Sequence, residues 1–199
     1  MLSRTDKCQK RVFDIILAIV GICLTWWIMV PAWIIASIET KRNGLFMQER
    51  IGKNGKPFLV FKIRTMRTIE GIESTVTTST DTRITKCGAF FRKTKIDELP
   101  QLFNVLLGEM SFVGARPDVP GFADQLEGED RVILELAPGI TGPSSLKYKD
   151  EEELLAKQQD PESYNREVIW PDKVAINKMY LENWSLKKDI EYIVKTIIG

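Results

Sequence analysis

The chain has 199 residues and a net charge of +1, a length that fits roughly one domain and a charge that provides no global basic field for nucleic acid. Histidine is absent, which excludes Ser-His-Asp and Cys-His catalysis, histidine metal ligands and histidine general bases. Any acid-base, nucleophilic or metal chemistry therefore falls mainly to Asp, Glu, Lys or Cys. The three cysteines match no zinc spacing and no disulfide framework, which is typical of a reducing compartment.

The N-terminal part contains an apolar stretch, residues 15–38, without a single charged residue. At about 1.5 Å per residue, a helix of this length can cross a bilayer core of roughly 30 Å. Pro31 lies inside the stretch, so we expect the helix to bend or break there. Basic pairs flank both ends, at 10–11 and 41–42, so the positive-inside rule gives no direction. We hypothesise a re-entrant hairpin that dips into one leaflet; a kinked single-pass helix fits the sequence equally well.

Two short strands are predicted next, at residues 46–50 and 58–64, with a Gly- and Pro-containing turn between them. Alternation in the second strand places Lys62 and Arg64 on one face. Two cations on one face usually mark a solvated surface, but they also suit a bound phosphate. Residues 70–82 are rich in Ser and Thr and are predicted to form a surface loop.

An amphipathic helix is predicted to begin at the adjacent carboxylates Asp97 and Glu98. Its apolar face has helical spacing, and Pro100 fits only a first turn, where its missing N–H is no loss. Asp97 would lie at or near the N-cap, and Gly108 would end the helix. On this stretch alone a capping role is the more common explanation, and a catalytic pair is the alternative. The apolar face consists of Leu99, Leu102, Phe103 and Leu106.

The C-terminal half alternates rigid loops with helices. Residues 111–117 are predicted to be an extended loop that presents Arg116, a side chain suited to bidentate phosphate contact. Helical patterns cover 119–137, with an interruption near Gly128, and 171–183, and a rigid turn lies at 138–143. The acidic run 150–153 opens a short helix; a metal site is the less common explanation. Ser185 is expected to cap a last helix whose apolar stripe comprises Leu186, Ile190, Ile193, Val194 and Ile197. We expect this stripe to pack on the core; a position on the membrane surface is the alternative.

Six motifs, in this order, resemble those of the bacterial sugar transferases, also called monotopic phosphoglycosyl transferases. The resemblance covers nearly the whole chain, including the basic-flanked apolar segment. The motifs are Gln48-x-Arg50-x-Gly52-x-x-Gly55-x-Pro57-Phe58, Phe61–Met66, Asp81-x-Arg83-Ile84-Thr85, Asp97–Val105, Gly108–Pro117 and Pro138–Gly142.

The resemblance implies an α+β fold, mainly helical with a small β-hairpin or sheet. Residues 1–42 would form a membrane-associated re-entrant helix broken at Pro31, and residues 43–199 a cytoplasmic catalytic domain at the bacterial inner membrane. Such enzymes move a phospho-sugar from a UDP-sugar to a polyprenol phosphate, usually undecaprenyl phosphate, and release UMP. Membrane lipid is a further partner, nucleic acid is not, and downstream glycosyltransferases and an oligomer are compatible with the family.

By the resemblance, Asp97 attacks the β-phosphorus and forms a covalent aspartyl-phosphosugar. Mg²⁺ is required, with Asp97 and Glu98 as its protein ligands or Glu98 in a proton-handling role. The family's basic residues near the phosphates match Lys62, Arg64, Arg92 and Arg116. Aspartate is an accepted phosphoryl nucleophile, and phosphoryl transfer needs positioned cations more than a strong base.

Three departures from the family pattern accompany the match. Ala115 replaces a proline before Arg116, and Lys95-Ile96 replaces the usual Ser-Leu before Asp97. The N-terminal apolar run is also longer than in compact members of the family. A catalytically silent membrane-tethered scaffold for polysaccharide assembly is the alternative function, and a metal-dependent diphosphate hydrolase is a third. Residues that select the sugar are expected within 70–82 and 146–170. The sequence does not identify that sugar.

Overall fold

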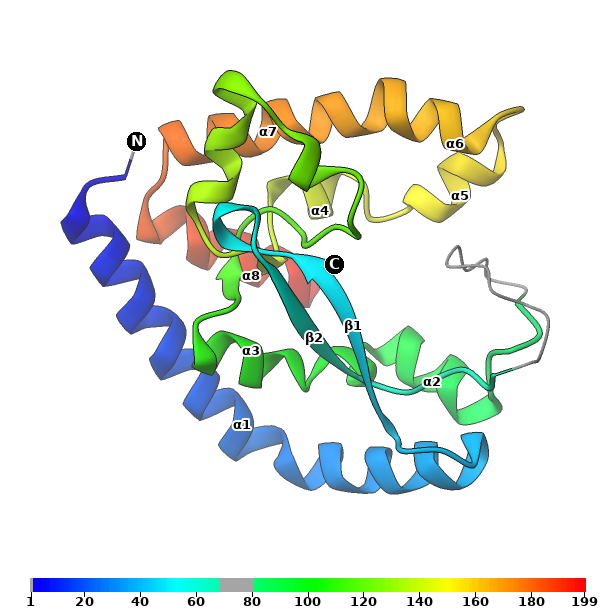
Figure 1. The fold of residues 1–199 in the computed structure, drawn as a ribbon. Helices are drawn as coiled ribbons and strands as arrows, with labels where there is room; N and C mark the ends of the chain where they lie inside the picture. Colours follow the sequence, from blue (N-terminus) through cyan, green and yellow to red (C-terminus); the bar gives the residue numbers. More distant parts are fainter. Residues whose placement is uncertain (1, 69–80) are drawn as a thin grey trace. The chain divides into compact units, whose positions relative to one another are not determined.

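The computed structural model describes residues 2–68 and 81–199, and within them the chain is mostly helical with two small sheets (Figure 1). The helices and strands are α1 (Arg4–Thr40), β1 (Leu45–Ile51), β2 (Pro57–Ile63), α2 (Lys86–Thr94), α3 (Gln101–Leu107), β3 (Ser111–Val113), β4 (Gly139–Thr141), α4 (Pro143–Lys147), α5 (Glu151–Ala156), α6 (Pro161–Tyr164), α7 (Trp170–Glu182) and α8 (Leu186–Ile198). The predicted α+β class, mainly helical with a small sheet, is confirmed. The predicted loop 70–82 lies outside the described residues except for its last two positions.

The chain folds into two compact units, each assembled from separate stretches of sequence. Unit 1 comprises Met1–Ile16, Glu49–Phe58 and Val105–Gly199. Unit 2 comprises Leu17–Gln48 and Leu59–Asn104. These two units do not coincide with the predicted division into residues 1–42 and 43–199. That division separates a membrane-associated segment from a catalytic domain, and it stays a prediction.

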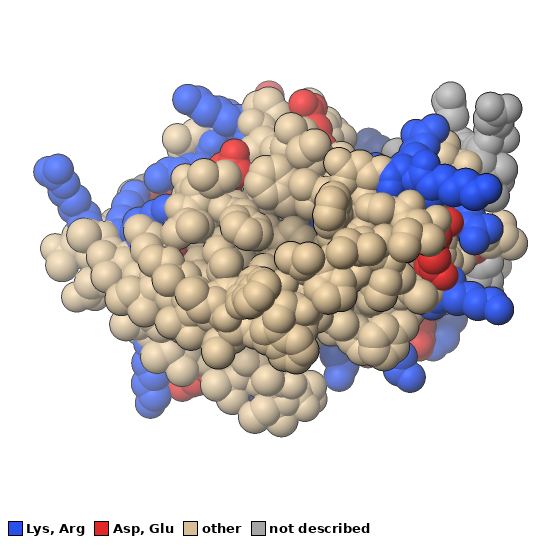
Figure 2. Space-filling model, turned by 90° about the horizontal axis from the view of Figure 1, so that it is seen from below, with Lys and Arg blue, Asp and Glu red and all other residues tan. Residues whose placement is uncertain are grey.

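Helix α1 is, within the described residues, the one helix long and apolar enough to cross a membrane. Helical structure continues through Pro31, so the predicted break is wrong as an end of the helix. Proline removes a single backbone hydrogen bond, and neighbouring turns can carry the helix past it as a kink. Many of its large apolar side chains face outward: Trp26, Trp27 and Ile38 are 58%, 60% and 72% exposed. Figure 2 shows a face on which uncharged residues predominate, with basic and acidic side chains around its edge.

The core of unit 2 joins the second half of α1 to β2 and α2. Ala32 and Ala36 of α1 are buried with Ile63 of β2 and Phe91 of α2. The two alanines leave room for close packing of the neighbouring elements. Thr85 is the N-cap of α2, and its side chain accepts a hydrogen bond from Gly88 N.

The core of unit 1 surrounds a short parallel pair, β3 and β4, which sequence patterns did not reveal as strands. Ser111 is paired with Gly139 and Val113 with Thr141. A Cβ on Gly139 would collide with the backbone N of Gly114, so glycine permits the two segments to approach this closely. The buried apolar residues of this core are Ile51, Val113, Ala123, Leu126, Ile133, Leu134, Leu136, Val174, Tyr180 and Leu181.

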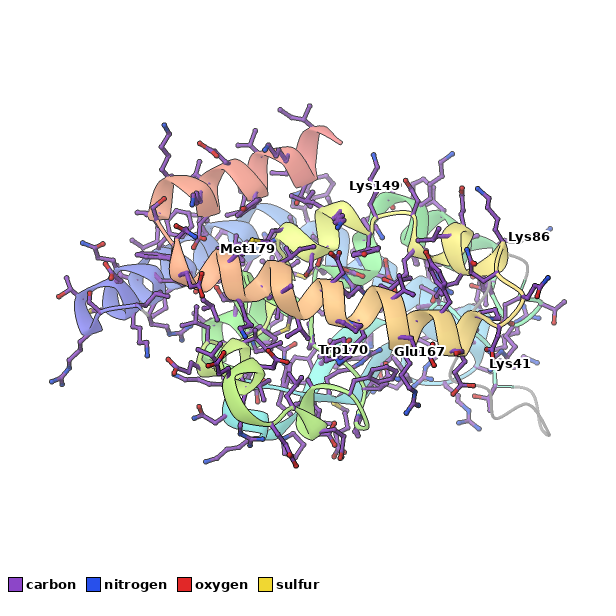
Figure 3. All side chains as sticks on the ribbon, turned by 90° about the horizontal axis from the view of Figure 1, so that it is seen from above. Lys41, Lys86, Lys149, Glu167, Trp170 and Met179 are labelled. Atoms are coloured by element: carbon purple, nitrogen blue, oxygen red, sulfur yellow. The ribbon has the colours of Figure 1, made fainter. Side chains whose placement is uncertain are left out.

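The predicted helix over 119–137 is wrong in type, because the segment forms only the 3₁₀ turns η3 (Ala123–Gln125) and η4 (Gly128–Glu135). Gly128 adopts φ +56°, a conformation that interrupts an α-helix. Downstream, α6 leads through a π turn, η5 (Asn165–Ile169), directly into α7. Figure 3 shows α7 from above, with Trp170 at its start and Met179 near its end.

Helix α8 has its predicted cap, because the Ser185 side chain accepts a hydrogen bond from Lys188 N. Only part of its predicted apolar stripe faces inward: Ile193 is half-buried and packs against the core of unit 1. Ile190, Val194 and Ile197 are 46%, 44% and 79% exposed, whereas Asp189 is fully buried. Asp189 accepts hydrogen bonds from Lys10 Nζ at 2.6 Å and Tyr180 Oη at 2.7 Å, and this burial of a charge sets which face of α8 turns inward.

Candidate active site

The carboxylate pair Asp97-Glu98 lies in a 3₁₀ turn, η2 (Ile96–Glu98), between α2 and α3. Lys95 precedes the turn with φ +59°, in the left-handed region, and ends α2 as its C-cap. Asp97 is therefore not the N-cap of the following helix, and the predicted capping role is wrong. Helix α3 begins only at Gln101, after Pro100. Asp97 is buried, with 7% of its surface exposed.

Within unit 2, Lys62 of β2 forms an ion pair with Glu98 of the 3₁₀ turn. Lys62 Nζ lies 3.4 Å from Glu98 Oε1, and the two side chains are 23% and 14% exposed. Strand β2 and helix α3 are joined by one side chain: Asn104 donates from Nδ2 to Leu59 O at 2.7 Å and accepts from Phe61 N at 3.0 Å. Asn104 is completely buried, so its bonds to β2 fix the distance between the Lys62 strand and the Glu98 turn.

The electrostatics of Asp97 reflect two opposing influences. Burial and the neighbouring Glu98 raise the pKa of its carboxyl above the usual value, while Lys62, Lys95 and Arg92 act to lower it. Burial is the largest of these influences, so the net pKa is raised. Asp97 Oδ1 is also buried without a hydrogen-bond partner within the described part of the chain. A buried carboxylate oxygen left unpaired in this way is available to an incoming electrophile or cation.

The other predicted phosphate-binding residues have different surroundings. Arg92 lies near the end of α2, with Nη1 3.8 Å from Met66 Sδ, and contributes to the field at Asp97. Arg64 donates from Nε to Asn43 O at 2.8 Å and lies over the Phe46 ring at 5.2 Å. Arg64 is thus engaged with the segment that follows α1.

Arg116 belongs to unit 1, where it is exposed on the loop that follows β3. The predicted site residues are therefore distributed over both units: Asp97, Glu98, Lys62, Arg64 and Arg92 share unit 2, and Arg116 is placed in unit 1. The predicted roles of these residues as nucleophile, metal ligands and phosphate ligands stay predictions.

The family profile described as "Bacterial sugar transferase" matches residues 5–199. This chain belongs to the bacterial sugar transferase family. The match covers the apolar helix, the Asp97-Glu98 turn and the Arg116 loop, so the resemblance inferred from the ordered motifs is confirmed.

Relatives in the family carry names that describe sugar-phosphate transfer. A Bacillus subtilis (strain 168) protein, 39% identical over 71% of this chain and 79% of its own length, is provisionally named an undecaprenyl-phosphate N-acetylgalactosaminyl 1-phosphate transferase. The UDP-glucose:undecaprenyl-phosphate glucose-1-phosphate transferase of Klebsiella pneumoniae is 32% identical over 98% of this chain. An Aeromonas hydrophila UDP-N-acetylgalactosamine-undecaprenyl-phosphate N-acetylgalactosaminephosphotransferase is 31% identical over 94%. The chain spans 41% and 42% of the length of these last two relatives.

One residue that organises the site in this sugar transferase was not singled out from the sequence. Asn104 stands in the predicted helix and was noted only as part of a motif. An amide side chain within a mostly apolar helical segment indicates a buried hydrogen-bonding residue, because a buried amide needs partners for both its N–H and C=O groups. Its partners belong to a strand more than forty positions earlier, which sequence spacing alone does not reveal.

Proposed function

We propose that the chain transfers a phospho-sugar from a UDP-sugar to a polyprenol phosphate such as undecaprenyl phosphate, and that Asp97 is the nucleophile. The observation that carries this proposal is the buried Asp97 carboxylate, whose Oδ1 has no partner in the described residues and which lies beside the Lys62–Glu98 pair. The names of the relatives, which describe transfer from UDP-sugars to undecaprenyl phosphate, support the substrate classes.

In the proposed first step, a carboxylate oxygen of Asp97 attacks the β-phosphorus of the donor. The bond between that phosphorus and the bridging oxygen breaks, and UMP leaves with the bridging oxygen. In the second step, an oxygen of the polyprenol phosphate attacks the phosphorus of the aspartyl-phosphosugar. The new lipid diphosphate forms and the Asp97 carboxylate is regenerated, so atoms and charge balance over the two steps.

The charged residues around Asp97 have complementary roles in this chemistry. Asp97 must be ionised to attack, and Lys62, Lys95 and Arg92 favour the ionised form against the effect of burial. Lys62 Nζ also lies 3.4 Å from Glu98 Oε1, so the carboxylate that follows Asp97 in the sequence is paired with a cation. Arg116 is proposed to bind donor phosphate, because a guanidinium matches phosphate oxygens in a bidentate fashion.

The carboxylates of Asp97 and Glu98 are suitable ligands for Mg²⁺, and the remaining ligands would come from the substrate. Within residues 2–68 and 81–199, no group of three Asp, Glu or Cys side chains could hold a metal ion. Mg²⁺ commonly binds through one or two carboxylates and substrate phosphates, which matches Asp97 with its unpartnered oxygen, Glu98 and a diphosphate. When bound, the ion would neutralise charge that develops on the phosphates.

We also propose that α1 is re-entrant, with both ends on the cytoplasmic face of the inner membrane. The first turns of α1 belong to unit 1: Lys10 pairs with Asp189, and Asp14 accepts a hydrogen bond from Phe112 N at 3.0 Å. After α1, the chain returns to the same unit at residues 49–58, where Ile51 N donates to Asp118 O at 2.9 Å. A straight crossing would separate these two stretches by a bilayer and break the buried Lys10–Asp189 pair.

Cysteine accessibility tests the orientation. Ser3→Cys, in a background with Cys8, Cys23 and Cys87 replaced by serine, is treated with a membrane-impermeant thiol reagent in intact and in permeabilised cells. Glu162→Cys, exposed in unit 1, is the matched control. We expect both positions to react only after permeabilisation. Reaction of Ser3→Cys in intact cells, with Glu162→Cys still protected, would overturn the re-entrant orientation.

UMP release tests the reaction. Wild-type protein is incubated with a panel of UDP-sugars, with and without polyprenol phosphate, and compared with Asp97→Asn and with Asp130→Asn, the same change at an exposed position outside the segments expected to select the sugar. We expect sustained UMP release only with lipid phosphate, loss of release in Asp97→Asn and no change in Asp130→Asn. Sustained release without lipid would identify a hydrolase, and release by Asp97→Asn would refute the covalent mechanism. Lipid binding without any UMP release would favour a scaffold.

A further inference from the structure

The loop that carries Arg116 is bonded to β4 on its N-terminal side. Gly114 N donates to Thr141 O at 2.9 Å, and Gly139 N donates to Ala115 O at 2.7 Å. A Cβ on Gly142 would also collide with Gly114 O, so the backbones are in close contact here. These bonds fix the loop up to the residue immediately before Arg116.

On its C-terminal side the same loop is bonded to the end of β1. Arg50 Nη1 donates to Pro117 O at 3.3 Å, and Ile51 N donates to Asp118 O at 2.9 Å. Arg50 is half-buried, whereas Arg116 is exposed. The two peptide carbonyls that flank Arg116, those of Ala115 and Pro117, are thus both hydrogen-bonded, one to β4 and one to a side chain of β1.

A carboxylate lies among the cations of this region. Burial raises the pKa of Asp118 to about 6, and nearby Lys173, Arg50 and Arg116 act in the opposite direction. Lys173, on α7, has its Nζ 2.6 Å from Glu151 Oε2. The positive charges around the Arg116 loop are therefore partly compensated by carboxylates in the same unit, which lessens their mutual repulsion.

We propose that Arg50 is a positioning residue for Arg116: by bonding Pro117 O, it holds the loop so that the Arg116 guanidinium meets the phosphates of the donor. This inference rests on the proposed function, in which Arg116 binds donor phosphate. Arg50 supplies its charge and its hydrogen bond to the loop and does not touch the substrate. The hydrogen bond from Arg50 to Pro117 O then links the Gln48-x-Arg50-x-Gly52 motif structurally to the motif that contains Arg116.

The first measurement is steady-state UMP release by the full chain in detergent or lipid, with the UDP-sugar varied. A hydrogen bond from a charged donor contributes about 1.5 kcal/mol at the lower end, which corresponds to roughly tenfold. We expect Arg50→Ala to raise KM for the donor about tenfold, with kcat changed less, and Arg50→Lys to raise it about threefold. Lys53→Ala removes an exposed cation from the turn after β1 and should leave KM unchanged.

The second measurement is a double-mutant cycle with Arg116→Ala. If Arg50 acts through Arg116, Arg50→Ala changes KM less than about twofold once Arg116 is absent. A direct phosphate contact, or a general loss of structure, would instead give the full tenfold effect in both backgrounds and overturn the inference. If Arg50→Ala fails to fold in a melting experiment, Arg50→Lys takes its place, and its threefold effect must vanish in the Arg116→Ala background.

The two proposals fail in distinguishable ways. Wild-type protein that releases no UMP from any donor refutes the proposed function, and the positioning role falls with it. Wild-type protein that is active, with Arg50→Ala indistinguishable from Lys53→Ala, refutes the positioning role alone.

Discussion

Loss of the Lys10 charge should destabilise unit 1 far more than loss of a neighbouring charge on the same helix. Lys10 Nζ lies 2.6 Å from Asp189 Oδ2, and the two side chains are 5% and 0% exposed. Lys10→Met leaves the Asp189 carboxylate buried without a cation, and breaking a buried pair typically costs about 3–5 kcal/mol. Tyr180 and Trp184 still donate to Asp189, so we expect the lower end, about 3 kcal/mol.

The assay is thermal unfolding of the purified full chain in detergent, followed by circular dichroism. For a chain of this size, about 3 kcal/mol corresponds to a decrease in Tm of roughly 6–12 °C. Lys7→Met is the control, because its partner Glu135 lies 3.3 Å away with both side chains about 40% exposed. An exposed pair contributes at most about 1 kcal/mol. Equal decreases in Tm for Lys10→Met and Lys7→Met would refute the reasoning.

Three further outcomes follow from the structure. Lys62→Met should move the acid limb of the pH dependence of kcat/KM to higher pH, because Lys62 lowers the pKa of Asp97; an unchanged limb would contradict that coupling. Asp118→Asn should stabilise the chain at pH 7 by at most about 3 kcal/mol, because a folded-state pKa of about 6, raised from 3.8, makes stability fall as pH rises between these values. Melting curves at pH 4 and pH 7 check this, and the gain should fall below about 1 kcal/mol at pH 4. Gly139→Ala should lower the yield of folded protein in gel filtration, because its Cβ would collide with Gly114 N.

Features determined by neighbouring residues were predicted well from the sequence. The hairpin strands lie within one residue of the predicted ranges, because turn residues and alternation are local signals. Ser185 was correctly predicted as the cap of α8 for the same reason. The ordered family motifs also indicated Asp97 and Glu98 as the candidate catalytic carboxylates.

Features determined by distant partners were predicted poorly. The apolar face predicted around Leu102 has Leu102 buried but Phe103 exposed, and Asn104 completely buried in its place. Asn104 turns inward because β2 supplies both of its hydrogen-bond partners, which helical periodicity cannot reveal. Asp97 sits in a 3₁₀ turn because the left-handed Lys95 and the late start of α3 separate it from the helix. The short strands β3 and β4 contain too few residues for alternation to show.

The separation of 179 positions between Lys10 and Asp189 in the sequence also has a consequence for biosynthesis. At about 5–20 residues per second, Asp189 is made roughly 10–40 seconds after Lys10. During that interval the first turns of α1 have left the ribosome without the carboxylate that neutralises Lys10, while the apolar residues after Ile16 are already available to lipid. If α1 enters the membrane as proposed above, insertion would come before unit 1 closes, and Asp189 would pair with Lys10 of an α1 that is already inserted.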